Sequence, residues 1–151
     1  MNNLKSSNFN KWQYKNILAI DFGTQFSGLA TFCPGRDPYP TPYGRLHSHD
    51  LYLLIGEIIK IVHDESIELA VLGIPYLLDG KETEMTRRIK NFGHKLAHKI
   101  APIPLNYQDE TLSSYAAEER MKSSPQYNFK SDLKKIDAVA ATIILEDFME
   151  K

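Results

Sequence analysis

The chain has little cysteine and no long hydrophobic stretch. Cys33 is the only cysteine among 151 residues, so this chain alone cannot form an intrachain disulfide, a zinc ribbon or an iron–sulfur centre. No apolar run approaches the roughly 18 residues that a membrane span requires. The first 15 residues are polar and lack the apolar core of a secretory signal peptide. We therefore expect a cytoplasmic protein that has no contact with a membrane.

Net charge is close to zero, yet the basic residues are unevenly distributed. The chain has 18 Lys and Arg against 19 Asp and Glu, which gives a formal net charge of −1. Residues 81–99 nevertheless hold six basic and two acidic side chains, and residues 120–135 hold five basic and one acidic. A neutral total can therefore hide a basic face, which is typical of a protein that contacts phosphate groups.

Length and composition indicate one globular domain. A chain of 151 residues with 42% hydrophobic and 25% charged residues has an ordinary globular make-up. Residues 1–14 are rich in Asn, Ser and Lys and lack apolar periodicity, so we expect a flexible leader there. The folded domain is expected to span residues 15–151.

Apolar runs predict five strands. Residues 34–44 contain four Pro and two Gly, which predicts a surface loop between the second and third strands. The run that ends at Pro75 is continuously apolar, as is typical of a strand covered on both faces. The expected strands are residues 14–20, 26–33, 45–48, 68–74 and 103–108.

Apolar residues at helical spacing predict helices between and after the later strands. Asp50 is a suitable N-cap for the first of them. The alternation of strands and helices in the second half implies parallel crossovers, whereas the first two strands form a hairpin. We therefore predict an α/β fold, with a mixed five-stranded sheet and helices on both of its faces. The expected helices are residues 51–65, 83–99, 112–121 and 137–149.

Acidic residues stand at the ends of three predicted elements. Asp21 ends the first strand, Asp109 and Glu110 end the fifth, and Asp137 begins the last helix. Strand ends and a neighbouring helix start can meet at one edge of a sheet, where converging carboxylates would bind Mg²⁺ or Mn²⁺. Position alone leaves simpler roles open: Asp137 as a helix cap, and the Asp109–Glu110 pair as a solvated turn.

Four stretches in order resemble the YqgF family, whose Holliday-junction-resolvase-like proteins are also described as pre-16S rRNA nucleases. They are IDFGTQFSGLA from Ile20, VLGIPYLLDG from Val71, QDETLSS from Gln108 and IDAVAATIIL from Ile136. The resemblance implies a three-layer RNase H-like fold and a metal-dependent nuclease that acts on precursor rRNA or branched DNA. Asp21, Glu110 and Asp137 match the acids of the family's site, which implies that they are its catalytic residues and the ligands of Mg²⁺ or Mn²⁺.

The sequence departs from the family pattern at two positions. The family usually has Arg in the turn after the first acid and Arg after the Asp-Glu pair, where this chain has Phe26 and Thr111. Arg can hold a phosphate through two parallel hydrogen bonds, which neither Phe nor Thr can do. A second hypothesis is therefore a non-catalytic nucleic-acid-binding or ribosome-associated module with a degenerate site.

The basic helix over residues 83–99 is the candidate contact with nucleic acid. Its basic side chains surround an apolar stripe, and such side chains fix the position of a phosphate backbone without reading sequence. An ordinary solvated helix face would show the same pattern. The oligomeric state is open between monomer and homodimer, since paired cuts in branched DNA need two sites. The candidate contact residues are Arg87, Arg88, Lys90 and Lys95.

Overall fold

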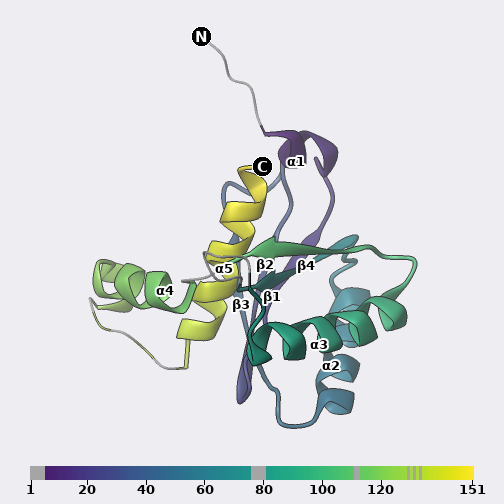
Figure 1. The fold of residues 1–151 in the computed structure, drawn as a ribbon. Helices are drawn as coiled ribbons and strands as arrows, with labels where there is room; N and C mark the ends of the chain where they lie inside the picture. The colour runs from purple at the N-terminus through teal and green to yellow at the C-terminus, as the bar shows by residue number, and fades with distance from the viewer. Residues whose placement is uncertain (1–5, 76–80, 111–112, 129, 131, 133) are drawn as a thin grey trace.

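A computed structural model shows an α/β fold in which helices cover both faces of one sheet (Figure 1). It describes residues 6–75, 81–110, 113–128, 130, 132 and 134–151. The strands are β1 (Ile17–Asp21), β2 (Phe26–Phe32), β3 (Thr41–His47), β4 (Leu69–Ile74) and β5 (Leu105–Asp109). The helices are α1 (Ser7–Lys11), α2 (Leu51–Asp64), α3 (Glu84–Ile100), α4 (Ser113–Lys122) and α5 (Ile136–Met149), with a 3₁₀ turn over Pro125–Tyr127.

The sheet is mixed, and its strand order is β3-β2-β1-β4-β5. Strand β2 pairs antiparallel with both β1 and β3. Strand β4 pairs parallel with both β1 and β5. This confirms the predicted hairpin start and the predicted parallel crossovers. Because β1, β4 and β5 run in the same direction, their carboxyl ends lie at one edge of the sheet.

Alternate side chains of β1 supply the two hydrophobic cores. Leu18 and Ile20 pack on one face with α2 and α3, and Ile17 and Ala19 pack on the other face with α5. All residues of β4 are buried, as its continuous apolar run predicts. Helix α5 is buried along most of its length and is the central helix on its face of the sheet (Figure 1). No helix in the described part of the chain has the length and apolar character that a membrane crossing requires.

Strand β3 begins four residues earlier than the predicted strand. The expected loop over residues 34–44 includes Pro42, but the strand starts at Thr41 and Pro42 pairs with Ala30. A proline is tolerated because β3 is an edge strand, where one side of the backbone needs no ladder hydrogen bond. The pairing shifts between Leu29 and Ala30, which forms a bulge in the β2–β3 ladder.

The N-terminal segment differs from the flexible leader that its composition suggests. Residues 7–11 form α1, and the side chains of Phe9 and Trp12 pack against the core beneath α5. The Ser6 side chain caps α1, and the Asn8 side chain donates to the Phe148 carbonyl oxygen at 2.9 Å. The docking arises from tertiary contacts with the last helix, which local periodicity does not reveal. Residues 1–5 lie outside the described residues.

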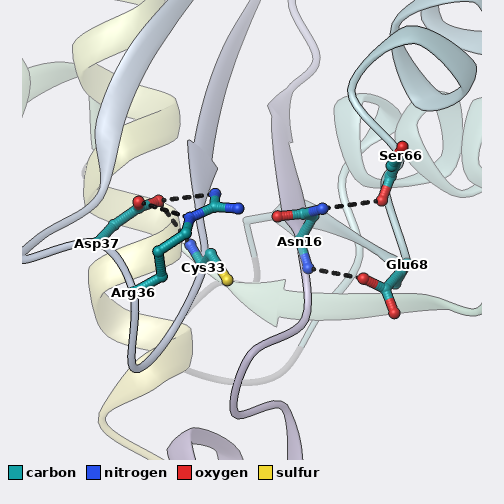
Figure 2. Close-up of polar contacts among 6 residues, drawn as sticks. All are labelled: Asn16, Cys33, Arg36, Asp37, Ser66 and Glu68. Atoms are coloured by element: carbon teal, nitrogen blue, oxygen red, sulfur yellow. Dashed lines mark hydrogen bonds and ion pairs between the residues drawn. The ribbon is translucent and has the colours of Figure 1, made fainter.

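The sheet edge opposite the carboxyl ends of β1 and β4 is held by local polar contacts (Figure 2). The Asn16 backbone N–H donates to Glu68 Oε1 at 3.3 Å, and the Asn16 side chain donates to the Ser66 carbonyl at 3.2 Å. In the loop after β2, Arg36 forms an ion pair with Asp37 at 3.1 Å. The charged groups drawn at this edge therefore contact one another or the backbone, and the predicted site residues lie elsewhere.

Candidate active site

Asp21 is placed by the last position of β1. It pairs with Gly28 of β2, and its side chain points to the face that α5 covers, as do Ala19 and Ile17, two and four residues earlier. The next residue, Phe22, faces the other core and stacks on Phe92 of α3 with ring centroids 4.7 Å apart. Packing on both sides of the strand end therefore fixes where the Asp21 carboxyl lies.

Gly28 brings the start of α5 against the sheet beside Asp21. A Cβ atom at Gly28 would lie 1.8 Å from the carbonyl oxygen of Asp137 and 2.1 Å from its carbonyl carbon. Only a residue without a side chain allows the helix to approach this closely. The glycine between two antiparallel partners thus sets the Asp137 backbone next to the Asp21 position.

The carboxyl of Asp21 is in an unfavourable environment for a negative charge. Burial, followed by the negative charge of Asp137, raises the pKa of Asp21 from 3.8 to about 7. Burial also raises the pKa of Asp137, and the positive charge of Arg45 opposes that rise. Asp21 is thus the carboxyl of this pair that holds a proton most readily near neutral pH. Such a pair is typical of a functional site.

Asp137 does not cap its helix. The N-cap of α5 is Lys135, which makes no side-chain capping hydrogen bond, and Asp137 lies within the first turn of the helix. A negative charge in the first turn is still stabilised by the helix dipole, so Asp137 can favour the start of α5 without capping it. Its closeness to Asp21 carries a cost that a solvated helix start would avoid.

Glu110 lies at the same edge of the sheet, beyond the end of β5. Its backbone N–H donates to the Ile74 carbonyl at 2.9 Å, which continues the pairing of Ile74 with Asp109. The Oε2 atom of Glu110 is buried. Strand β4 lies between β1 and β5, so Asp21 and Glu110 are two strand spacings, about 10 Å, apart across the sheet, and the register also places Glu110 two residues further along the strand direction.

The structure brings two of the three expected ligands together. Within the residues that the structure describes, no three His, Cys, Asp or Glu side chains form a group that could hold a metal ion. Asp21 and Asp137 supply the hard oxygen donors that Mg²⁺ and Mn²⁺ prefer. A divalent cation would also offset both causes of the raised Asp21 pKa, which are the burial of the carboxyl and its repulsion by Asp137. The pair fits such a cation, and a three-carboxylate site that includes Glu110 stays a prediction.

Arg45 of β3 lies near the carboxylate pair, and the sequence did not indicate this. It pairs with Gly28 on the side opposite Asp21, and its guanidinium carbon lies 3.7 Å from the centroid of the Phe26 ring. The Phe26 ring in turn lies 4.7 Å from the His47 ring. The neighbours of Arg45 are set by the β2–β3 register. In the sequence, Arg45 is only a charged residue after a proline-rich loop, so its neighbours could not be predicted.

The four basic residues of the candidate nucleic-acid contact lie along α3 in different surroundings. Thr86 of the first turn donates to the Pro75 carbonyl at 2.9 Å, so α3 begins at the edge that holds the acids. Arg87 and Arg88 are exposed in this first part of the helix. Lys90 forms an ion pair with Glu82. Lys95 lines a largely apolar groove of about 500 Å³ between α2 and α3.

Comparison with solved structures supports the fold. Thermus thermophilus RuvC in complex with a Holliday junction substrate aligns with a TM-score of 0.55 at 10% identity, covering 86% of this chain and 91% of RuvC. The yeast mitochondrial Holliday junction resolvase Ydc2 aligns with a TM-score of 0.53 at 10% identity, covering 91% of this chain and 78% of Ydc2. The fold is therefore the RNase H-like fold that the resemblance implied.

Comparison of sequences gives the family. A protein of Maridesulfovibrio salexigens named "Putative pre-16S rRNA nuclease" is 34% identical over 135 residues, 89% of this chain and 98% of its own length. A protein of the same name from Dechloromonas aromatica is 36% identical over 138 residues, 89% of this chain and 90% of its length. The family model described as "RuvX: Holliday junction resolvase" matches residues 15–151. The chain belongs to this RuvX family, as its resemblance to the YqgF proteins predicted.

Proposed function

We propose that this protein is a metal-dependent nuclease that hydrolyses phosphodiester bonds in structured nucleic acid, with precursor 16S rRNA or branched DNA as its substrate class. The observation that carries the proposal is the Asp21–Asp137 pair at the carboxyl end of β1, where Gly28 allows the start of α5 to approach the sheet. Relatives over 30% identical that carry a nuclease name support the reaction class. Cys33 is a buried free thiol, which is consistent with a reducing cytoplasm.

Each residue has a defined task in this proposal. Asp21 and Asp137 would hold Mg²⁺ or Mn²⁺, with Glu110 as a third ligand from beyond the end of β5. A bound divalent ion supplies the Lewis acidity that phosphodiester hydrolysis requires. Burial and the charge of Asp137 raise the pKa of Asp21 to about 7, so Asp21 would have to be deprotonated to act as a ligand of the cation. The charge of the nucleic-acid backbone is met by the basic residues of α3.

A second candidate function is a nucleic-acid-binding module without catalysis. The observation that favours it is Phe26, the first residue of β2, at a position where the family usually has Arg. The other departure, Thr111, lies outside the described residues. This candidate shares the binding surface with the nuclease and differs from it in leaving the strand intact.

Cleavage assays separate the two candidates. Labelled structured RNA and a four-way DNA junction are incubated with the protein in Mg²⁺, Mn²⁺ or EDTA, and products are resolved on denaturing gels. Asp21→Asn is run alongside to exclude a contaminating nuclease. Asp64→Asn is the matched control, since Asp64 is an exposed carboxylate at the far end of α2.

The nuclease proposal expects cleavage that needs a divalent ion, is lost in Asp21→Asn and is retained in Asp64→Asn. Binding of substrate by Asp21→Asn should remain, because the basic residues are unchanged. Cleavage that persists in Asp21→Asn would refute the assignment of this residue. Clean binding by the wild-type chain without products in either metal would favour the non-catalytic module.

A further inference from the structure

Helix α2 presents large apolar side chains to solvent as well as to the core. Leu54 and Ile58 are buried in the core that α2 forms with the sheet and α3. On the outer side of the helix, Tyr52 is 84% exposed, Leu53 58% and Ile59 37%. Tyr52 and Ile59 are seven residues, about two turns, apart, so they lie on one face of the helix. Large apolar side chains grouped at the surface in this way indicate a contact site.

These side chains line a groove between α2 and α3, here called the α2–α3 groove. Its volume is about 500 Å³, and its lining is largely apolar. The two helices pack on the face of the sheet opposite α5, so the groove is separate from the Asp21–Asp137 pair (Figure 1). Gly56 forms part of the wall, and a Cβ atom there would meet nothing within 4 Å. From Tyr52 to Lys60 the α2 wall extends about 12 Å, the length of about two helical turns.

The charged residues of the α2–α3 groove are mostly basic. Lys60, Lys95 and Lys99 line it together with one acid, Glu57. Glu57 pairs with Lys60 at 3.5 Å. Lys95 and Lys99 are exposed, lie one turn apart on α3, and form no ion pair with another residue in the described part of the chain. The groove therefore combines an apolar lining with two positive charges on one wall that no neighbouring acid neutralises.

This combination distinguishes between the occupants that an apolar groove can have. A second copy of the chain would bring its own three lysines against these, and like charges facing each other across an interface are repulsive. A nucleic-acid strand would neutralise the lysines but would place its charged backbone against apolar side chains. An amphipathic helix with acidic residues beside its apolar face complements both features, as in the helix-in-groove mode of recognition.

We propose that the α2–α3 groove binds an amphipathic helix of a partner protein, with its apolar side chains against the outer face of α2 and its acidic side chains beside Lys95 and Lys99. The inference goes beyond the nuclease proposal and does not depend on it. The groove and the Asp21–Asp137 pair lie on opposite faces of the sheet, so the bound helix leaves the carboxylates accessible.

Binding of designed peptides to the full chain tests the chemistry of the occupant. The first labelled peptide is a helix of about 15 residues with Leu on one face and Glu beside it. The second has Lys in place of every Glu, and the third has the composition of the first with its Leu positions scrambled. Fluorescence anisotropy measures the affinity of each. We expect the first peptide to bind roughly tenfold more tightly than either of the others, since only it matches both the lining and the charge.

Charge reversal in the chain tests the two lysines of α3. Lys95→Glu and Lys99→Glu should each weaken binding of the acidic peptide roughly fivefold, because an attractive exposed contact becomes a repulsive one. Each should also strengthen binding of the basic peptide. Lys134→Glu is the matched control, since Lys134 is an exposed lysine just before α5, which packs on the other face of the sheet. It should leave both affinities unchanged.

Gly56→Gln tests the groove without a change of charge. The space around Gly56 is open, and Gln has a higher helix propensity than Gly, so the variant should fold. The added side chain occupies the groove, so the acidic peptide should bind roughly tenfold more weakly. Gly56→Ala adds only a methyl group and should bind the peptide nearly as the wild type does. Unchanged affinity in Gly56→Gln would mean that the peptide binds elsewhere, which would overturn the inference.

Three further results would overturn it. The first is a wild-type chain that binds none of the peptides or all three equally. The second is a dimer in sedimentation velocity that Gly56→Gln dissociates, because the groove would then be an interface between copies of the chain. The third is a loss of four-way DNA junction binding in Lys99→Glu as large as that in Arg88→Ala, because the wall of the groove would then face nucleic acid.

Discussion

Gly28 lies so close to Asp137 that a Cβ atom there would stand 1.8 Å from the Asp137 carbonyl oxygen. The neighbouring atom belongs to the backbone of α5, so it cannot yield by a rotamer change. The close approach brings the first turn of the helix down to the sheet beside Asp21. The absence of a side chain at Gly28 therefore allows the two carboxylates to lie near each other.

We expect Gly28→Ala to destabilise the protein and to separate the carboxylate pair. The added methyl group forces the start of α5 away from the sheet, and overpacking of this kind costs about 1–3 kcal/mol. The measurement is the free energy of unfolding by urea, together with Mn²⁺ binding by the folded variant. Gly28→Ala with wild-type stability and wild-type Mn²⁺ affinity would show that the contact does not position Asp137.

Gly56→Ala is the matched control for that experiment. Gly56 is an exposed residue within α2, and a Cβ atom there meets nothing within 4 Å. Alanine has the higher helix propensity, so this substitution should raise the free energy of unfolding by about 0.5–1 kcal/mol. The two Gly→Ala substitutions should therefore act in opposite directions.

Stability should fall as pH rises through the titration of Asp21. The pKa of Asp21 is raised from 3.8 to about 7 in the folded chain, so the protonated carboxyl favours the folded state. That contribution is complete below pH 3.8 and is lost as the pH rises to about 7. At about 1.4 kcal/mol per pKa unit, its upper bound is about 4 kcal/mol.

Asp21→Asn isolates this contribution. Asparagine cannot ionise, so the variant should match the wild type near pH 4 and exceed it in the free energy of unfolding at pH 8, in EDTA. Urea denaturation at several pH values provides the comparison, with Asp64→Asn as a control that shows no such difference. Parallel pH profiles for the wild type and Asp21→Asn would contradict a raised pKa at Asp21.

The sequence predicted the sheet and the positions of the acids at element ends well, because both depend on local pattern; their role as a site stays a prediction. The apolar runs of β1 and β4 and the polar turns around them identify buried strands without knowledge of their neighbours. Asp21 and Glu110 follow from the same signal, since each stands where an apolar strand stops. Asp137 was located at the start of an apolar helix. Their common edge then follows from the parallel direction of β1, β4 and β5.

What the sequence did not reveal depends on contacts between distant elements. The α1 helix is stabilised by Phe9 and Trp12 docking near α5, and its five residues are too few to form a helix on propensity alone. Pro42 suggested a loop because its place on an edge strand was unknown. Arg45 reaches Phe26 only through the β2–β3 register, and a bulge after Leu29 shifts that register.

Metal binding should depend on the Asp21–Asp137 pair more strongly than on Glu110. The negative charge of Asp137 acts on Asp21, whereas β4 separates β1 from β5, the strand that Glu110 follows. We expect Mn²⁺ to raise the Tm of the wild type at pH 8 but not that of Asp21→Asn or Asp137→Asn. Glu110→Gln should retain part of the rise. Thermal unfolding with and without Mn²⁺ measures this order.

Protons compete with the metal at this site, so the Mn²⁺-induced rise in Tm should be smaller at pH 5 than at pH 8. Asp64→Asn again serves as the control and should respond as the wild type does. A full response in Asp137→Asn, or the same response at both pH values, would contradict the proposed ligands.

The four basic residues of α3 should contribute unequally to nucleic-acid binding. Arg87 and Arg88 lie in the part of α3 that starts at the acid edge, whereas Lys95 is eleven residues from Glu84, about 16 Å along the helix. We expect Arg87→Ala and Arg88→Ala each to weaken binding of a four-way DNA junction and to reduce its salt slope by about 0.9.

Lys95→Ala should have a much smaller effect, because its side chain lines the groove against α2. Lys90→Ala should also have a small effect, since Lys90 is already paired with Glu82. Fluorescence anisotropy over a salt series measures all four variants, with Lys15→Ala as a control at the opposite edge, where Lys15 pairs with Glu68. Equal losses for Lys95→Ala and Arg88→Ala would mean that nucleic acid covers the whole length of α3 and not only its start.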